Sequence, residues 1–362
     1  MVDRSTPSRD VLLRVLDRAR WAPSGDNTQP WRFQIIADDY VVVHGHDTRD
    51  EILYDFDGHA SHMAHGALLE TLRIAASAEG LAVGWEIEPD KEQRRIKYHV
   101  RLVPVTTGIA DPLAPFIEQR CVQRRPMRLQ SLTDTQRSAL IAAAGEDFEV
   151  RLFESFSERR KIAKLLWNNA YIRLTCPEAY PVHASIIEWN ARFSKDRIPE
   201  QAVGVDPITA KLMRWVLGSW GRVEFFNRFL MGTIAPRVQL DYLPAICCSA
   251  HALIVSKRGL NSLSDWVELG QAMQRFWLEA SRQGLYLQPE MTPLIFGWYR
   301  AFGRKFSADF AVDRRAKALA GDLLEVAGGS DLVRCGFFCR LGVSPKPLSR
   351  SIRRELCDLI LQ

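Results

Sequence analysis

Two distant stretches of the chain carry the same residues at a constant spacing. Gly66 and Gly270 are 204 positions apart (270 − 66), and five further pairs share this offset: Ala76/Ala280, Ser77/Ser281, Gly80/Gly284, Leu81/Leu285 and Pro89/Pro293. The pairs follow a long helix, the glycine that ends it and the next strand. The spacing predicts that one supersecondary unit occurs twice. The alternative is chance similarity between two amphipathic helices that end in Gly-Leu.

Shorter elements also recur in the two halves. Apolar residues at helical spacing predict a helix over residues 11–20, and an alternating apolar run predicts a strand over 33–36. In the second half, Thr133 can cap a helix that runs to Ala144, and residues 148–153 alternate as a strand. The first half is further expected to contain a long helix and three strands, at residues 61–79, 40–43, 81–88 and 96–103. Duplication of a helix and strand unit is therefore favoured.

The two halves differ in the loop between their first helix and first strand. The first half has a loop of ten residues, 22–31, with the sequence Ala-Pro-Ser-Gly-Asp-Asn-Thr-Gln-Pro-Trp, whereas the second has only Gly145, Glu146 and Asp147. Hydroxyls, amides and bare backbone N–H groups at one place suit a polar, partly anionic ligand. The alternative is an ordinary turn in which Ser24 and Asn27 bond their own backbone.

The ten-residue loop resembles the APSxxNxQPW signature of the nitroreductase superfamily, whose members use flavin mononucleotide (FMN). This resemblance implies an α+β nitroreductase-like fold, with mixed β-sheets flanked by helices. It also implies that the loop lies against the flavin, with its Ser and Asn touching the ring and the ribityl chain. The cofactor-binding residues expected at this end of the chain are Arg20, Pro23, Ser24, Gly25, Asn27 and Gln29.

Members of this family are usually homodimers with flavin sites at the subunit interface. A duplicated chain resembles one such dimer folded into a single polypeptide, the pseudo-dimeric branch of the family, and such a chain can function as a monomer. The first half is expected at residues 1–112 and the second at 113–362, with one FMN between them. A helical insertion at about 155–240 is expected to act as a lid over the site, although most of its aromatic residues are expected in the core.

Two arginine-rich stretches resemble the phosphate-binding elements of the family. Arg120 and Arg124 stand in Arg-Cys-Val-Gln-Arg-Arg, where Cys121 and Val122 replace the hydroxyl residue that is common there. In the stretch 349–354, Arg353 is the first candidate, with Arg350 and Arg354 as alternatives. Arginine suits a phosphate dianion because its planar fork bonds two oxygens at once.

A third stretch resembles the element that places a backbone N–H near flavin N5. Pro289 and Glu290 look like the Pro-x-Glu-Gly variant of this element, with the glycine absent. The resemblance implies hydride transfer through N5 and turnover in which NAD(P)H and the acceptor use one pocket in succession. No separate catalytic residue is assigned, because the flavin carries the chemistry.

The expected function is that of an FMN-dependent oxidoreductase. Its acceptor would be a nitroaromatic, a quinone or a related small molecule, or the enzyme would dehydrogenate a biosynthetic intermediate. The alternative is a catalytically weak flavin-binding or flavin-storage protein whose lid closes over FMN. A relic of the fold without cofactor is a third possibility. The acceptor, and the choice between NADH and NADPH, are not determined by the sequence.

Composition excludes several other classes of function. The formal charge of +5 is modest, and the basic clusters at 120–128 and 346–354 lack the interleaved aromatic residues of nucleic-acid binders. No apolar run approaches the ~20 residues that a bilayer helix needs, and residues 1–10 lack the apolar centre of a secretory signal. Seven cysteines without CxxC spacing suggest reduced thiols in the cytoplasm. Neither a nucleic-acid partner nor a membrane partner is expected.

Other site chemistries lack their motifs. His59, His62 and His65 recur every three residues after His44 and His46, but there is no HExxH and no matching carboxylate pair, so surface histidines rather than a metal site are expected. There is no GxGxxG after a strand, no GxxxxGK[ST] and no GxSxG elbow. Cys247 and Cys248 are expected inside an apolar strand over 245–255.

Overall fold

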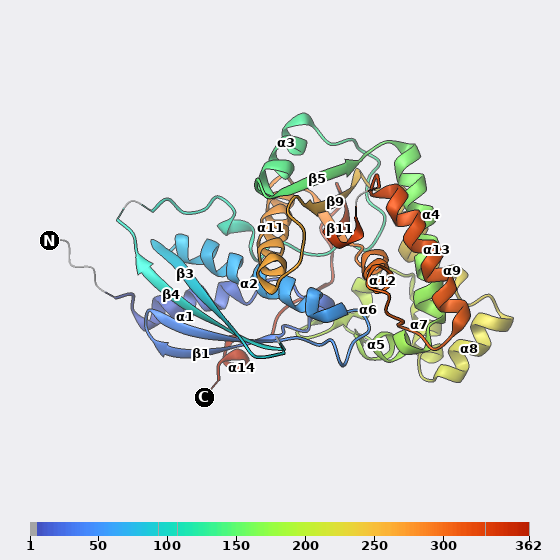
Figure 1. The fold of residues 1–362 in the computed structure, drawn as a ribbon, viewed down its shortest axis with the longest axis horizontal. Helices are drawn as coiled ribbons and strands as arrows, with labels where there is room; N and C mark the ends of the chain where they lie inside the picture. The colour runs from blue at the N-terminus through green and yellow to red at the C-terminus, as the bar shows by residue number, and fades with distance from the viewer. Residues whose placement is uncertain (1–5, 93, 107, 330, 362) are drawn as a thin grey trace.

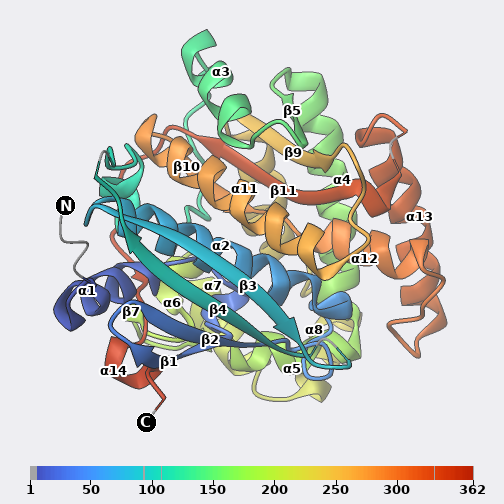
Figure 2. The same cartoon turned by 60° about the vertical axis from the view of Figure 1, so that its left-hand side comes forward.

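A computed structural model of the chain describes residues 6–92, 94–106, 108–329 and 331–361. The chain folds into two units, each with a four-stranded sheet, and two long helices lie side by side between the sheets (Figure 1, Figure 2). The first five residues, part of the segment in which no secretory signal is expected, lie outside the described residues. None of the described helices is long and apolar enough to cross a bilayer.

The first half has two helices and one antiparallel sheet. Its elements are α1 (Arg9–Ala19), β1 (Trp31–Ala37), β2 (Tyr40–His46), α2 (His59–Ser77), β3 (Leu81–Pro89) and β4 (Arg95–Pro104). Helix α1 begins at the N-cap Ser8 and buries Leu12, Val15 and Leu16 against the sheet side of α2. Pro23 follows its end, as expected for a residue that cannot continue a helix.

The second half contains elements in the same order, with one insertion between β5 and β9 and another, formed by α12 and α13, between β10 and β11. Its helices and strands are α3 (Asp134–Ala143), β5 (Phe148–Phe153), β9 (Ala250–Ser256), α11 (Leu263–Arg282), β10 (Tyr286–Pro289), α12 (Thr292–Ala301), α13 (Phe310–Val326) and β11 (Cys335–Gly342). Strands β9 and β11 are buried along their whole length, which explains their continuous apolar sequence.

The larger insertion lies between β5 and β9. It comprises α4 (Phe156–Thr175), α5 (Tyr180–Ser185), β6 (Ile187–Glu188), β7 (Phe193–Ser194), β8 (Ile198–Pro199), α6 (Glu200–Val203), α7 (Pro207–Val216), α8 (Trp220–Phe229), α9 (Ile234–Pro236) and α10 (Leu243–Ile246). Helix α4 packs against α13 and belongs to the core of the second half, whereas α7 and α8 lie at the edge of the molecule (Figure 1). The chain ends with β12 (Arg350–Ser351) and α14 (Leu356–Leu359).

The two sheets have the same strand order. The first is β1-β2-β4-β3 and the second, read from its other edge, is β5-β9-β11-β10. Every neighbouring pair in both sheets is antiparallel, and in both halves the long helix lies between the second and third strands in sequence. The predicted α+β class is confirmed. Parallel pairing occurs in the short pairs β6–β8 and β7–β12.

Gly66 and Gly270 lie where the two long helices cross. A Cβ added to Gly66 would lie 2.0 Å from the carbonyl oxygen of Val267, and one added to Gly270 would lie 2.1 Å from the carbonyl oxygen of Met63. The two backbones are therefore too close for any side chain larger than hydrogen. The repeated glycine brings α2 and α11 together, and its two copies face each other.

The C-terminal segment returns to the first half. Ile360 forms a parallel bridge with Phe33 of β1, and Leu361 N donates to Phe33 O at 2.8 Å. Leu359 is fully buried in the first core, and Figure 2 shows α14 next to β1. This return carries the arginines of 350–354 across the boundary between the halves.

Several predicted details differ from the structure. The predicted helix 61–79 spans His59–Ser77, and the predicted strand 33–36 spans Trp31–Ala37. Cys247 and Cys248 precede β9 rather than lying within a strand, because Pro244 favours a helical turn in α10, which ends at Ile246.

The histidines expected at the surface are buried. His59, His62 and His65 are 9 %, 2 % and 0 % exposed, because the second half covers His59 while residues of the first half, such as Tyr98 and Asp47, enclose the other two. His59 stacks on Trp266 of α11 at 3.8 Å between ring centroids. Among the described residues no group of His, Cys, Asp and Glu is arranged to hold a metal ion.

Candidate functional site

A cavity of about 450 Å³ is lined by both halves and by the insertion. Its walls include residues of the ten-residue loop, of α2, α4, α7 and α11, of the segment after β10, and of the C-terminal stretch. The volume is within the range of small-molecule sites, about 300–1,000 Å³.

The ten-residue loop has an unusual backbone. Asp26, Asn27 and Gln29 have φ values of 49°, 66° and 52°, in the left-handed region that residues other than glycine rarely adopt. Ser24 Oγ accepts a hydrogen bond from Gln29 N at 2.9 Å, which closes the loop on itself. Strained backbone of this kind persists where the surrounding structure fixes it, and it clusters at functional sites.

The insertion and the C-terminal stretch hold the loop from outside. Gln29 is fully buried, and its Nε2 donates to Lys195 O while its Oε1 accepts from Arg354 N, both at 2.9 Å. Asn27 Nδ2 donates to Ile352 O at 3.1 Å. Asn27 Oδ1 is buried without a hydrogen-bond partner among the described residues, and Asn27 lines the cavity. The conformation of the loop therefore depends on segments far away in sequence.

Four arginines from two stretches line the cavity: Arg120, Arg124, Arg350 and Arg353. Residues 122 and 123 run beside β10, where Val122 bridges Leu287. The arginines bond mainly backbone carbonyls: Arg120 Nη2 donates to Trp21 O at 2.9 Å, Arg353 Nε to Ala22 O at 3.0 Å, and Arg350 Nη2 to Arg120 O at 3.4 Å.

None of these four guanidinium groups forms an ion pair with a carboxylate of the described residues. Arg120 and Arg353 are 3 % and 7 % exposed, and Arg120 Nε has no hydrogen-bond partner in that same part of the chain. Charge that is buried without a counter-ion is costly, so the cluster is suited to an anion.

The pKa values of these arginines are lowered because their positive charges are buried without a carboxylate partner in the described part of the chain. Burial, together with the charge of Arg350, lowers the pKa of Arg120 to about 9. Burial, and then Arg120, Arg350 and Arg20, lower the pKa of Arg353 well below its ordinary value. Burial lowers the pKa of Arg124 to about 10, against the attraction of Asp26. An anion bound among these side chains would reverse the shifts.

Most of the predicted cofactor-binding residues line this cavity. They are Pro23, Ser24, Gly25, Asn27, Arg120, Arg124, Pro289, Glu290, Arg350 and Arg353. Arg20, Gln29 and Arg354 are not among the lining residues. Arg20 pairs with Asp17 at 2.7 Å, and Arg354 pairs with Asp196 at 3.2 Å. The side chain of Gln29 donates to Lys195 O instead.

Glu290 belongs to a buried charged triad in the cavity wall. Its carboxylate bonds His251 Nδ1 at 2.8 Å and Arg340 Nη1 at 2.9 Å, and all three side chains are almost inaccessible. Burial acts against a charged imidazole, but the charge of Glu290 raises the pKa of His251 to about 10. The backbone N–H of Glu290 donates to Phe338 O at 2.8 Å, so it is not free for a ligand.

The structure adds a second polar group that sequence reasoning missed. Tyr54 Oη lies 2.9 Å from His183 Nε2, and Arg173 pairs with Asp241 at 3.2 Å. Burial lowers the pKa of His183 to about 3 and raises that of Asp241 to about 6. The charge of Arg173 acts to lower the pKa of Asp241, but the effect of burial is larger.

Two further residues of this group are turned to the cavity with spare hydrogen-bonding capacity. Asn169 Oδ1 is buried without a partner among the described residues, one helical turn before Arg173 on α4. Burial raises the pKa of Asp26, against the attraction of Arg124 and Arg173. Asp26 occupies one of the variable (x) positions of the APSxxNxQPW signature, so the signature does not identify it. In the insertion, the i, i+4 spacing of Asn169 and Arg173 was the sequence signal that could have placed these two side chains together.

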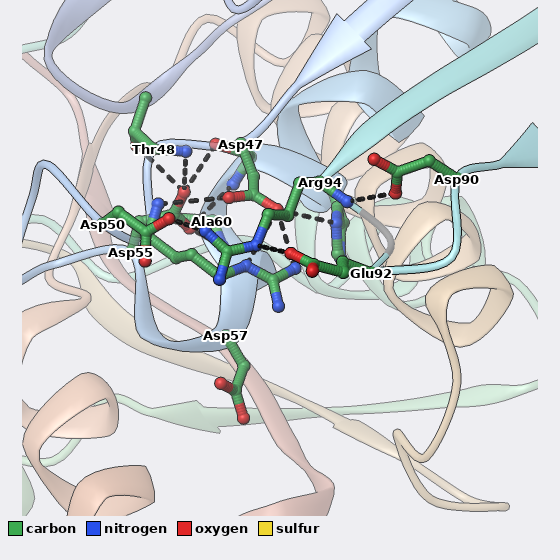
Figure 3. Close-up of polar contacts among 12 residues, drawn as sticks. Asp47, Thr48, Asp50, Asp55, Asp57, Ala60, Asp90, Glu92 and Arg94 are labelled. Atoms are coloured by element: carbon green, nitrogen blue, oxygen red, sulfur yellow. Dashed lines mark hydrogen bonds and ion pairs between the residues drawn. The ribbon is translucent and has the colours of Figure 1, made fainter.

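The loop before α2 holds Tyr54 in place. The buried carboxylate of Asp55 accepts hydrogen bonds from Thr48 N at 2.9 Å and from Ala60 N at 3.0 Å (Figure 3). Nearby, Arg94 pairs with Asp50 and with Glu92 (Figure 3). Asp50 and Asp55 of this loop are thus engaged by residues of the first half, and Tyr54 lines the cavity.

Comparison with known proteins connects this geometry to a family. The family model "Nitroreductase family" matches residues 2–56, which include the ten-residue loop. An uncharacterized protein of Mycobacterium tuberculosis is 24 % identical over 303 residues, covering 80 % of this chain and 39 % of that protein. A putative NAD(P)H nitroreductase of the same species is 28 % identical over 184 residues, covering 44 % of this chain and 54 % of that protein. The chain thus spans about half or less of the length of these relatives.

Solved structures give weaker similarities. The FMN-dependent nitroreductase NfnB from Mycobacterium smegmatis, crystallised with NADPH, aligns with 67 % of this chain and 94 % of its own at 12 % identity and a TM-score of 0.37. A nitroreductase-like family protein from Bacillus cereus aligns with 70 % of this chain and 96 % of its own at 11 % identity and a TM-score of 0.34. TM-scores below 0.5 do not establish a common fold. The resemblance to the nitroreductase superfamily that the ten-residue loop predicts is confirmed through the family model that matches residues 2–56 and the curated relative that carries the same family name.

Proposed function

We propose that this protein is an FMN-dependent oxidoreductase with its flavin site in the 450 Å³ cavity. One observation carries the proposal: a loop with the nitroreductase signature and four arginines without carboxylate partners among the described residues line the same cavity. A ligand that is anionic at one end and polar along its length satisfies both features.

The chain's own residues fit the parts of FMN. Arg120, Arg124, Arg350 and Arg353 would hold the phosphate, because all four line the cavity and none of them forms an ion pair with a carboxylate of the described residues. Ser24 and Asn27 would contact the ring and the ribityl chain, and the unpartnered Oδ1 of Asn27 is an acceptor for such a ligand. Bound FMN supplies hydride chemistry at its N5 atom.

The halves at residues 1–112 and 113–362 are proposed to be duplicated copies of one fold. The shared strand order and the facing glycines support this proposal. In a duplicated chain the contacts between the two subunits of a dimer would be made within one polypeptide. A monomer would therefore be enough to form the complete flavin site. Seven unpaired cysteines support a reducing, cytoplasmic environment.

The second polar group of the cavity would serve the substrates. Tyr54 and the neutral His183 offer a proton donor, and Asp26 and Asn169 offer hydrogen-bond acceptors. The apolar side chains around them suit the ring of a nitroaromatic or quinone acceptor, with NAD(P)H as the proposed reductant. The name of one relative, a putative NAD(P)H nitroreductase, supports this choice of reductant.

Flavin storage is the second candidate, and one observation favours it. The insertion contributes Val203, Met213, Leu217 and Leu240 to the cavity wall, so it covers the site as a closed lid would. Anaerobic addition of NADPH separates the candidates. Bleaching of the flavin spectrum supports the oxidoreductase, whereas a flavin that dithionite reduces and neither NADH nor NADPH reduces supports storage.

The phosphate assignment is tested by comparing FMN with riboflavin. Arg124→Gln should weaken FMN binding by about tenfold or more and riboflavin binding much less, because a charge-assisted hydrogen bond contributes about 1.5–3 kcal/mol. Arg125→Gln is the matched control, since the neighbouring Arg125 is exposed and bonds Gln201 O. Fluorescence titration of the apoprotein measures both affinities. Equal weakening of the two flavins would remove Arg124 from the phosphate site.

A further inference from the structure

Helix α7 is apolar on two opposite faces. Met213 and Leu217 face inward and line the cavity. Ile208, Leu212 and Trp215 are spaced i, i+4 and i+7 on the outer face and are 80 %, 47 % and 52 % exposed. The inner face is explained by the cavity. The outer face contacts α8 through Trp215 and Phe226 and otherwise stays exposed.

Helix α8 extends the outer apolar face. The rings of Trp215 and Phe226 lie 5.8 Å apart, and Phe225 contacts Phe229 with centroids 5.2 Å apart. Phe225 and Phe229 are 52 % and 62 % exposed. We name the whole surface the α7–α8 patch, formed by Ile208, Leu212, Trp215, Phe225, Phe229, Leu230, Met231 and Ile234. A contiguous exposed patch of this kind marks an interaction site.

Basic side chains surround the α7–α8 patch. The guanidinium of Arg222 lies 4.6 Å from the Trp215 ring and that of Arg228 5.4 Å from the Phe229 ring. Lys211 and Arg214 are also exposed on α7. The nearby acidic residues are Glu224 and Asp206, and Asp206 caps α7 through Ile208 N and Thr209 N. Four positive charges against two negative ones give the patch a positive surplus.

We propose that the α7–α8 patch docks the protein on an anionic membrane surface. Trp, Phe and Leu on one face with Lys and Arg beside them are the composition of helices that lie in the lipid interface. The aromatic rings would enter the region of the headgroups while the arginines remain at the phosphates. The sequence-based expectation of no membrane partner rested on the absence of a spanning segment, which surface docking does not need.

Docking would also place the cavity next to the lipid. Met213 in the cavity wall lies on the same helix as Leu212 and Trp215 of the patch, and Leu217 caps that helix. A lipophilic acceptor dissolved in the membrane would therefore be separated from the cavity by one helix. This second step rests on the proposed oxidoreductase function, whereas docking itself does not.

Vesicle sedimentation with the full chain tests docking. Wild-type protein should sediment with vesicles of phosphatidylcholine containing phosphatidylglycerol and remain in solution with phosphatidylcholine alone. Binding should weaken as salt is raised, because ions screen exposed charges beyond about 10 Å at 0.1 M. Loss of three charges in Lys211→Gln/Arg214→Gln/Arg228→Gln should lower affinity about a hundredfold, at about 1 kcal/mol or roughly fivefold per basic residue.

The aromatic contribution is tested by a second variant and a matched control. Phe225→Ser/Phe229→Ser should abolish sedimentation with anionic vesicles while flavin occupancy stays at the wild-type level, because neither residue lines the cavity. Phe156→Ser is the control, since Phe156 is 60 % exposed, begins α4 and does not belong to the α7–α8 patch. This control should bind vesicles as the wild type does.

Three results would overturn the proposal. One is the absence of vesicle binding by a folded, flavin-binding wild-type protein. Another is equal binding to neutral and anionic vesicles. The third is a stable dimer in sedimentation velocity that Phe225→Ser/Phe229→Ser converts to a monomer without any change in vesicle binding, which would assign the patch to a second copy of this chain.

Discussion

The two halves of the molecule share one strand order but contribute different kinds of segment to the cavity. The first half has eleven residues between α1 and β1, and this segment reaches the cavity with three left-handed residues. The second half has only four residues between α3 and β5, and none of these four lines the cavity. It contributes instead the arginines beside β10 and the large insertion between β5 and β9.

The difference shows that similar sheets do not imply similar sites. The repeated core elements, α2 and α11, are held to close packing by glycines on both sides. The loops between the elements are not so restricted, and they differ in length and in chemistry. The buried charges differ as well: the first half buries a neutral histidine, His65, and the second buries a charged one, His251.

The largest effect is expected where the halves meet. The double variant Gly66→Ala/Gly270→Ala should lower the free energy of unfolding by about 5 kcal/mol, because each overpacked contact costs about 1–3 kcal/mol and both new Cβ atoms meet backbone. Gly221→Ala in α8 is the control, since nothing lies within 4 Å of its Cβ. Urea unfolding measures both. A small loss in the double variant would mean that the helices can separate without cost.

A smaller loss is expected from the charged triad of the second half. Glu290→Gln leaves His251 and Arg340 buried without their carboxylate and should lower the free energy of unfolding by about 3 kcal/mol. Glu79→Gln removes a partly exposed ion pair with Arg14 in the first half and should cost far less. Urea unfolding compares the two. Equal losses would show that burial does not distinguish these pairs.

The histidines should give the halves opposite pH responses. Burial, and then His62, lower the pKa of His65 to about 3, so stability is lost as pH falls from 6.5 towards that value and the unfolded chain takes up the proton. His251 has a raised pKa, so its contribution is complete below 6.5 and is lost as pH rises through about 10.

The test is the slope of stability against pH. His65→Gln should reduce the acid slope by about 1.4 kcal/mol per pH unit, one proton's worth, between pH 6.5 and 3. His251→Gln should instead remove the loss of stability that accompanies the rise of pH through about 10. Urea titrations at several pH values measure the slopes, and an unchanged slope in His65→Gln would contradict the assignment.

The smallest effects concern the equivalent helices α1 and α3. Thr133 and Gln136 form a reciprocal capping box at α3, with bonds of 3.0 and 3.2 Å, whereas Ser8 makes one bond of 3.5 Å at α1. Thr133→Ala should cost about 1 kcal/mol and Ser8→Ala a few tenths. Thermal unfolding of the two variants measures both losses of stability. Equal losses would contradict the expected difference between the two caps.

The sequence determined the elements whose information is local. Thr133 was placed as a helix cap from its position before an apolar run, and the structure has it there with Gln136 as its partner. Gly80 and Gly284 were placed at the ends of the long helices, and both have positive φ. Periodicity and capping depend on neighbours within a few residues, so they can be read without knowing the fold.

The composition of the site depended on tertiary structure. Arg354 and Arg353 are adjacent in sequence, yet the first pairs with Asp196 and the second lines the cavity, because the return of the C-terminal stretch to β1 sets their directions. Asn169, Arg173, His183 and Asp241 stand in different elements of the insertion and carry no shared motif. The sequence predicted a loop suited to a polar, partly anionic ligand, and the tertiary structure decided which charges line the same cavity, because burial and pairing are set by contacts between distant segments.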